Sequence, residues 1–379
     1  MKKLLFLFAL SLCSIAAWAS DFSAVAPTGQ TLYYSYSSSH TVTVTRPPNS
    51  SSSHPWSPED SLSIPSSVSI DGYTYSVTAI DGHAFQYCSG LTCVTIPNSV
   101  TTIGDCAFQY CSGLTSITIP NSVTIIDVRA FEYCSNLTSI VIPNSVTTIG
   151  AEAFRYCSSL TSVTISNSVT VIESEVFKNC SGLTSVTIPN SVTTINGSAF
   201  RNCSGLTSVT IPNSVIAIEN EAFYGCSGLT SVTIPNSVTT IGDNAFDDVF
   251  LVYYCGSASG SPWGAYHGGC FYEEGDFVYQ DNTKTTLIAY IGSEQNVTIP
   301  NSVTTIDHFY HRGTAITSVT IGENVQTIGD YAFAFNTQLT TVNFNADSCT
   351  YMGGSFFDYE FDSYSNIFFL SWICLCSKN

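Results

Sequence analysis

The sequence predicts a repeat solenoid of the α/β type, in which short parallel strands stack at a period of 23 residues around a spine of phenylalanine rings. The first observation is a leucine that opens successive units, at Leu91, Leu114, Leu137, Leu160, Leu183, Leu206 and Leu229. The second is a phenylalanine near the end of each unit, at Phe85, Phe108, Phe131, Phe154, Phe177, Phe200, Phe223 and Phe246. The third is the alternation of apolar residues with Ser and Thr inside each unit, which is typical of half-buried strands. Self-similarity at a period of roughly 20–50 residues is the signature of a solenoid.

The N-terminus has the pattern of a cleaved signal peptide. Lys2 and Lys3 precede an apolar run over 4–17, and Ala17-Trp18-Ala19 has the small residues of a cleavage site. We therefore expect residues 1–19 to be a signal peptide of bacterial type and the mature protein to be exported.

The presence or absence of the repeat pattern divides the rest of the chain into four segments and a tail, of which two are repeat blocks. Residues 20–61 are rich in Ser and Pro and are expected to form a flexible lead-in or an N-terminal cap. The first repeat block is 62–248, and a connecting segment rich in Gly, Ser and aromatic residues follows at 249–295. The second block is 296–343. Residues 344–379 lose the pattern, and we interpret them as an irregular tail in which the last repeat is truncated or frame-shifted.

Each unit encodes two short strands and the turns between them. The pattern Leu-x-x-Val-x-Ile places three apolar residues on the inward side of a first strand, and Ser-Val-Thr-Thr-Ile supplies a second inward pair. The Pro and Asn of Ile-Pro-Asn-Ser turn the chain out of the first strand. One unit alone buries too little to fold, so we expect neighbouring units to share one core, with the Ala-Phe pairs stacked through its middle.

The unit LTSVTIPNSVTTIGDNAF at 229–246 resembles the BspA-like class of bacterial leucine-rich repeats, and the resemblance extends over roughly 62–343. It implies a curved solenoid with the first strands on its concave side. It also implies a secreted or surface protein that binds other proteins, with extracellular matrix proteins as the ligands, and it implies no catalytic residues.

The composition narrows the choice of partners. The chain has 28 acidic and only 10 basic residues, for a formal net charge of −18, so it would repel the phosphate backbone of a nucleic acid. No stretch after residue 19 reaches the roughly 20 apolar residues that a membrane-spanning helix requires. We therefore expect neither a nucleic-acid partner nor a transmembrane span.

The cysteines and histidines form no recognisable cofactor or metal motif in the sequence. Seven of the 15 cysteines recur at the repeat period, and we favour buried thiols over disulfides for them: Cys88, Cys111, Cys134, Cys157, Cys180, Cys203 and Cys226. Cys255 and Cys270 are better disulfide candidates. His308 and His311 are three residues apart but lack a surrounding ligand set, which favours a surface turn. No nucleophile elbow, phosphate-binding loop or HExxH motif occurs, so we expect no enzyme activity.

Two surfaces could contact a partner. Ser and Thr recur between the inward residues of the first strand, at Ser116, Ser139, Ser162, Ser185, Ser208, Ser231, Thr95, Thr118, Thr164, Thr187, Thr210 and Thr233. This face is uniform and carries little information for choosing one ligand. More distinctive residues follow the spine phenylalanine, and they are our candidate binding residues: Tyr87, Tyr110, Tyr133, Tyr156, Arg155, Lys178 and Arg201. Tyr and Arg are enriched at protein interfaces. The alternative is that the rings cover the convex edge while the cations offset Glu152 and Glu175 nearby.

The sequence therefore favours a secreted or cell-surface protein that mediates adhesion or protein–protein interaction with host or neighbouring-cell proteins. The alternative is a structural surface-layer or spacer solenoid that associates with itself and has no specific ligand.

Overall fold

The computed structural model describes residues 22–48, 58, 60–310, 316–333, 336, 338–346, 349–352 and 368–369 of the chain. The chain folds as two compact units. The first unit comprises Met1–Val252 and Gly256–Tyr266, and the second comprises Tyr253–Cys255 and His267–Asn379. The expected signal peptide lies outside the described residues, as does most of the tail.

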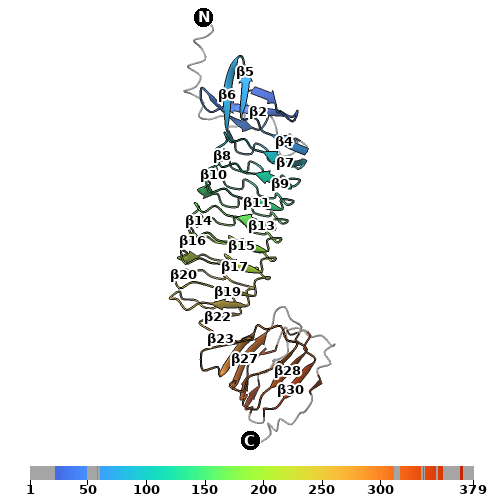
Figure 1. Ribbon diagram of the computed structural model, residues 1–379, viewed down its shortest axis with the longest axis vertical. Helices are drawn as coiled ribbons and strands as arrows, with labels where there is room; N and C mark the ends of the chain where they lie inside the picture. The colour runs from blue at the N-terminus through green and yellow to red at the C-terminus, as the bar shows by residue number, and fades with distance from the viewer. Residues whose placement is uncertain are drawn as a thin grey trace. The chain divides into compact units, whose positions relative to one another are not determined.

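The repeats of the first unit stack as two columns of short parallel strands (Figure 1). The first-strand column contains β7 (Leu91–Thr95), β9 (Ser116–Thr118), β11 (Ser139–Val141), β13 (Ser162–Thr164), β15 (Ser185–Thr187), β17 (Ser208–Thr210) and β19 (Ser231–Thr233). The second column contains β8 (Thr102–Ile103), β10 (Ile125–Ile126), β12 (Thr148–Ile149), β14 (Val171–Ile172), β16 (Thr194–Ile195), β18 (Ala217–Ile218) and β20 (Thr240–Ile241). Equivalent residues face each other, as Ser162 faces Ser185. The predicted solenoid of short parallel strands is confirmed.

A series of hydrogen-bonded turns closes each repeat. The sequence analysis predicted a solenoid of the α/β type, which would contain helices, but no helix occurs among the described residues. Alternate amides in the turn bond to the next repeat. The N–H groups of His83, Phe85 and Tyr87 each donate to a carbonyl one repeat onward, at 2.8 Å in all three cases. The intervening amides close the turn locally, as when Gln86 N–H donates to the His83 carbonyl at 3.2 Å. Because the chain satisfies its backbone groups in this way, it requires no helix on this side.

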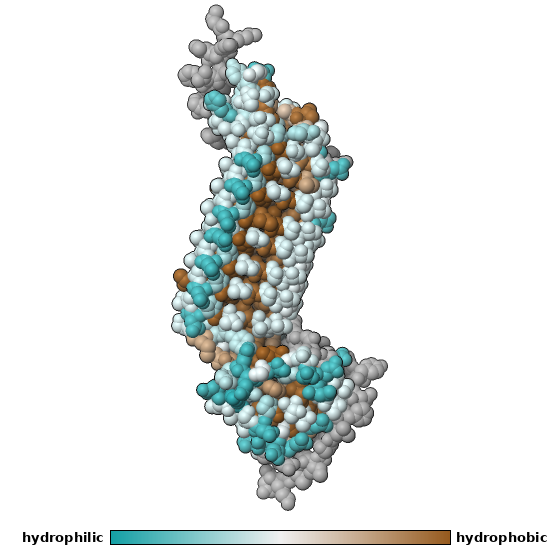
Figure 2. Space-filling view, in the orientation of Figure 1, coloured by the Kyte–Doolittle hydropathy of each residue, from teal (hydrophilic) through white to brown (hydrophobic). Residues whose placement is uncertain are grey.

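The phenylalanine spine forms the middle of this core. Consecutive rings from Phe85 to Phe246 stack nearly parallel, with centroids 5.1–5.6 Å apart, and all of these side chains are fully buried. On the surface of the first unit, Figure 2 shows other apolar residues as a stripe along the stacked repeats. The predicted spine is confirmed.

An antiparallel sheet begins the first stack. β1 (Phe22–Val25), β2 (Thr31–Tyr36) and β3 (Thr41–Thr45) pair antiparallel, and β3 then pairs parallel with β6 (Tyr73–Ile80), which leads into the second column. β5 (Ser67–Ile70) forms a hairpin with β6, while β4 (Asp60–Ser63) pairs with β7. The N-terminal strands thus cover the open end of the first repeat, and their own side chains Leu32, Tyr34 and Val42 are buried.

The second unit repeats this plan. Its antiparallel strands are β23 (Tyr272–Glu274), β24 (Phe277–Tyr279) and β25 (Thr286–Tyr290), after which β25 pairs parallel with β27 (Thr305–Tyr310). The parallel columns continue through β29 (Thr327–Ile328) and β31 (Tyr351–Met352), and through β26 (Asn296–Thr298), β28 (Ser318–Ile321), β30 (Thr341–Phe344) and β32 (Phe368–Phe369). Parallel pairing therefore extends past residue 344, where the sequence pattern fades.

The cysteines separate into one disulfide and a buried ladder. Cys255 and Cys270 form the disulfide that the sequence favoured. The seven ladder cysteines are buried thiols. From Cys111 onward each donates to the carbonyl of the spine phenylalanine one repeat earlier, 26 residues before it, as Cys157 Sγ does to Phe131 at 3.2 Å. Burial raises the pKa of Cys157 to about 12.

We expect the ladder thiols to resist alkylation in the native protein. At pH 8 a thiol with a pKa near 12 is ionised in roughly one molecule in ten thousand, and these side chains are also inaccessible. Cys93, which is half-exposed on β7, provides the comparison. Iodoacetamide labelling followed by peptide mass spectrometry should modify Cys93 before denaturation and the ladder only after it. Rapid labelling of Cys157 in the native protein would contradict this assignment.

Candidate interaction surface

The tyrosine column consists of Tyr87, Tyr110, Tyr133 and Tyr156, which occupy the same place in four successive turns. This place is left-handed in each of them, with φ between 60° and 66°. A left-handed φ is unfavourable for most residues but is tolerated by Asn and is ordinary for Gly. Asn179, Asn202 and Gly225 continue the column with the same sign of φ. The change from Tyr to Asn and Gly therefore follows what the backbone accepts most easily, and the tyrosines are the exceptions.

Stacking holds the four rings in place. Successive centroids are 4.8, 4.6 and 4.3 Å apart, with interplanar angles of 9–12°. Each tyrosine is half-buried, so the rings cover one another and leave their edges toward solvent. Burial, followed by a hydrogen bond with Tyr156, raises the pKa of Tyr133 to about 12. The phenol of Tyr133 therefore remains neutral at physiological pH.

A cation column lies one residue before the tyrosine column, and it contains Arg155, Lys178 and Arg201. The Arg155 guanidinium is 5.1 Å from the centre of the Tyr156 ring, within the range of a cation–π contact. Arg201 lies 4.5 Å from the ring centre of Tyr224 in the next turn. The structure thus brings the predicted tyrosines and Arg155 together, while Lys178 and Arg201 extend the surface beyond the last ring.

Glutamates neutralise these cations. Arg155 Nη1 lies 2.5 Å from Glu152, 3.2 Å from Glu175 and 3.8 Å from Glu132. Lys178 Nζ is 3.0 Å from Glu175, and Arg201 pairs with Glu221. The sequence analysis had weighed Glu152 and Glu175 as offsetting charges, and both are indeed partners of the cations. The surface therefore presents paired charge instead of a free positive patch.

Glu132 was missed by the sequence analysis. It occupies the column of Arg155 one turn earlier, its side chain is 6% exposed, and Gln109 Nε2 donates to its carboxylate. Burial is the main cause that raises its pKa, whereas the neighbouring arginines lower it. By contrast, the hydrogen bond from Arg129 lowers the pKa of Glu152. The 23-residue spacing could have identified it, because Glu132 and Arg155 occupy the same position in successive repeats.

The Ser and Thr ladder lies on the first-strand column as predicted. In β9, β13, β15 and β19 the outer residues are exposed and the central Val or Ile is buried. Val141 interrupts the Thr ladder and is 65% exposed. This face is chemically uniform over many turns, and nothing on it converges into a built site.

Among the described residues, one group combines three potential metal ligands: His83, Asp105 and Cys106. The sequence analysis considered only His308 and His311, and the side chain of the first and the whole of the second lie outside the described residues. The described part of the chain contains no helix that is long and apolar enough to cross a membrane.

A family model and a solved structure both match this chain. The model of the BspA type leucine-rich repeat region matches residues 65–183, 193–254 and 289–373, in six copies, and these ranges make up more than half of the chain. No curated protein matches. The crystal structure of a leucine-rich repeat protein from Bacteroides ovatus is similar, with 22% identity, a TM-score of 0.51, and coverage of 88% of this chain and 99% of that one. This likeness shows a shared fold.

Two other solved structures are similar at lower TM-scores. A leucine-rich cell surface protein from Faecalibacterium prausnitzii has 27% identity and a TM-score of 0.42, covering 87% of this chain and 78% of that one. A leucine-rich repeat protein from T. pallidum has 26% identity and a TM-score of 0.36, covering 60% of this chain and 85% of that one.

Proposed function

The chain belongs to the BspA type leucine-rich repeat family, and from this premise we propose that it is an exported, non-catalytic protein that binds proteins of a host or a neighbouring cell. Proteins of this family are typically secreted or displayed at the surface, and the N-terminal sequence agrees with export. We propose that the partner contacts the edge formed by the tyrosine and cation columns.

The observation that carries this proposal is the tyrosine stack. Tyrosine offers a large amphipathic contact area with few rotatable bonds, so its ordering costs little on binding. Here neighbouring rings at 4.3–4.8 Å already hold one another, which reduces the cost further. Four aromatic edges in a row suit an extended partner better than a compact one.

The paired charges support specificity more than affinity. Arg155 is ion-paired with three glutamates, so a partner would have to displace an existing contact to use the guanidinium. Charged groups at an interface contribute to specificity more than to affinity, because they penalise a mismatched surface. We therefore assign the affinity to the rings and the orientation of the partner to the charges.

The test is a variant in which Tyr87, Tyr110, Tyr133 and Tyr156 are all replaced by Asn. The chain itself shows that Asn fits here, because Asn202 Nδ2 donates to Asn179 Oδ1 at 2.9 Å in the same column. Purified mature chain should bind saturably to at least one member of a panel of immobilised extracellular-matrix and plasma proteins. The Asn variant should lose at least about tenfold in affinity, since aromatic anchors contribute about 2 kcal/mol or more.

The matched control changes the strand face instead. Replacing Thr164, Thr187, Thr210 and Thr233 by Asn alters four exposed positions at the same spacing of 23 residues. Binding that is lost equally in both variants would remove the edge from the proposal. Absence of binding to the panel, together with self-association on size-exclusion chromatography, would favour the structural spacer instead.

A further inference from the structure

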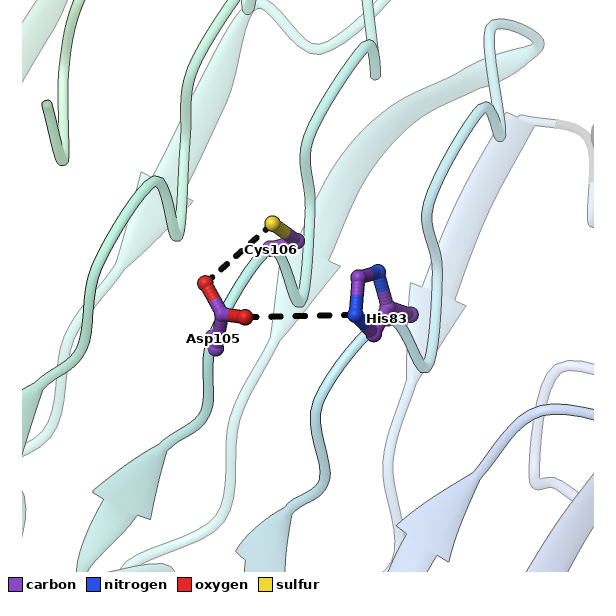
Figure 3. Close-up of side chains that lie close together, drawn as sticks. All are labelled: His83, Asp105 and Cys106. Atoms are coloured by element: carbon purple, nitrogen blue, oxygen red, sulfur yellow. Dashed lines mark hydrogen bonds and ion pairs between the residues drawn. The ribbon is translucent and has the colours of Figure 1, made fainter. Parts of the chain in front are cut away.

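Three side chains of different ligand chemistry converge where the first two turns of the stack meet. His83 comes from the turn after β6, and Asp105 and Cys106 come from the equivalent turn after β8. Figure 3 shows the three side chains pointing toward one another across adjacent turns. His83 Nε2 lies 3.9 Å from one oxygen of Asp105, and Cys106 Sγ lies 3.2 Å from the other. All three ligand atoms lie within 4.8 Å of one another.

The spacing of the ligand atoms approaches that of a tetrahedral metal site. With metal–sulfur bonds of about 2.3 Å and metal–nitrogen or metal–oxygen bonds of about 2.0–2.1 Å, neighbouring ligand atoms lie about 3.3–3.6 Å apart. The two distances here, 3.2 and 3.9 Å, lie on either side of that range. The two distances end on different oxygens of Asp105, and the three ligand atoms lie within 4.8 Å of one another. Side-chain movements of about 1 Å would therefore bring them onto one ion.

A chain of hydrogen bonds orients the ring of His83. Gln86 Oε1 can only accept, so His83 Nδ1 donates to it at 3.0 Å. Gln86 keeps that orientation because its own amide nitrogen donates to Gln109, whose amide in turn donates to Glu132. With Nδ1 engaged by Gln86, Nε2 is the ring nitrogen that faces Asp105 and is open to a metal. Metal-ligating histidines are held by the same kind of partner on their second nitrogen.

His83 and Cys106 occupy the same position in successive repeats, and they differ from the residues that follow at that position. Equivalent positions in the next turns hold Arg129, Glu152, Glu175, Ser198, Glu221 and Asn244. Cys106 is therefore outside the buried thiol ladder, and it has a left-handed φ of 54°. Neither the spine nor the turn requires a cysteine here. Arg129, the nearest cation in the column, is engaged by Glu152 at 2.7 Å, which offsets its charge.

The site is open on one side. The side chains of Asp105 and His83 are 49% and 24% exposed, whereas Cys106 is 4% exposed. An ion can therefore enter from solvent and retain one coordination position for water or for a donor from a partner. We propose that His83, Asp105 and Cys106 form a three-ligand site for a borderline-soft divalent cation of the Zn²⁺ class. Thiolate, imidazole and carboxylate together favour such an ion over Ca²⁺ or Mg²⁺.

The test uses Co²⁺ as a spectroscopic probe on the full mature chain. Titration should give one equivalent of bound Co²⁺ with an absorption band for thiolate-to-metal charge transfer, and Zn²⁺ should displace it. The band should disappear in C106S, and the affinity should fall at least tenfold in H83Q and D105N. Q86L should weaken binding by about 10–100-fold, because it removes the acceptor that orients His83.

Two controls separate this site from other thiols. C93S removes a half-exposed thiol on β7 and should leave the band unchanged. The double variant C374S/C376S removes two closely spaced cysteines in the tail and should also leave it unchanged. Persistence of the band in C106S, its loss in the tail variant, or the absence of any bound Co²⁺ would each overturn the proposal. Unchanged thermal unfolding of metal-free C106S would exclude misfolding as the cause of a lost band.

Discussion

Replacing Phe154 by alanine is expected to reduce the free energy of unfolding of the first unit by about 3–5 kcal/mol. The ring is fully buried and stacks on Phe131 and Phe177 at 5.3 and 5.6 Å. Its removal leaves a cavity between two turns and interrupts contacts on both sides. Urea unfolding should show a lower midpoint. Hydrogen exchange should show the largest loss of protection in the turns around residues 131, 154 and 177.

The neighbouring residue provides the control. Ala153 is also buried, but Val176 occupies the equivalent place one turn later at 1% exposure. The turn therefore accommodates valine, and Ala153→Val should cost much less than the loss of the ring. Equal destabilisation by both substitutions would mean that any disturbance of the turn, and not the spine, determines stability.

Replacing Arg155 by glutamine should cost about 2–3 kcal/mol at pH 8. The guanidinium lies between three carboxylates, of which Glu132 is the most buried. Removing one partner from a buried ion pair typically costs about 3–5 kcal/mol, and the smaller figure here reflects a side chain that is 24% exposed. Gln86 and Gln109 occupy the same column, so the turn itself accepts glutamine.

The loss should depend on pH. Burial already raises the pKa of Glu132 in the folded protein, and removal of Arg155 raises it further. A carboxyl with a raised pKa is destabilising when ionised, so the penalty is absent below its ordinary value near 4.5 and grows as the pH rises through the folded value. Glu152 has a lowered pKa, and its contribution is lost as the pH falls. Urea unfolding of both proteins at pH 4 and pH 8 should show the difference between them shrinking at pH 4.

Lys178→Gln is the matched control for charge. Lys178 has one carboxylate partner among the described residues, Glu175 at 3.0 Å, so its loss should cost about 1 kcal/mol or less. A cost equal to that of Arg155→Gln would show that the three-carboxylate cluster has no special role.

Periodicity predicted the fold well for a physical reason. When every unit meets a copy of itself, an inward position in one turn is inward in all of them, so Leu160 or Val163 can be assigned from the pattern alone. The turn ladder could not be predicted in this way. Its alternate left-handed residues include His83, Glu152 and Tyr156, which are not residues that signal such a conformation. The absence of helix among the described residues follows from those dihedral angles, not from hydrophobic spacing.

The candidate surfaces were predicted less completely. The tyrosine and cation columns follow from spacing, but the partners of Arg155 depend on which side chains reach across turns. His83 and Cys106 are likewise 23 residues apart, yet a His and a Cys in one column are informative only once Asp105 is seen between them. The sequence analysis compared cysteines only with cysteines and histidines only with histidines. It therefore did not group His83, Asp105 and Cys106, which the stacking of the repeats brings together.

The register of the stack also determines how this molecule can change in length. Because each turn contacts its equivalent 23 residues away, as Ser162 contacts Ser185, duplication or loss of one whole unit leaves nearly every remaining side chain opposite the kind of residue that it meets now. Copy number is therefore a variable that recombination can alter in one event without repacking the interior. Such an event adds or removes a tyrosine or a cation on the edge, so the extent of the contact surface can evolve by unequal crossing-over as well as by point mutation.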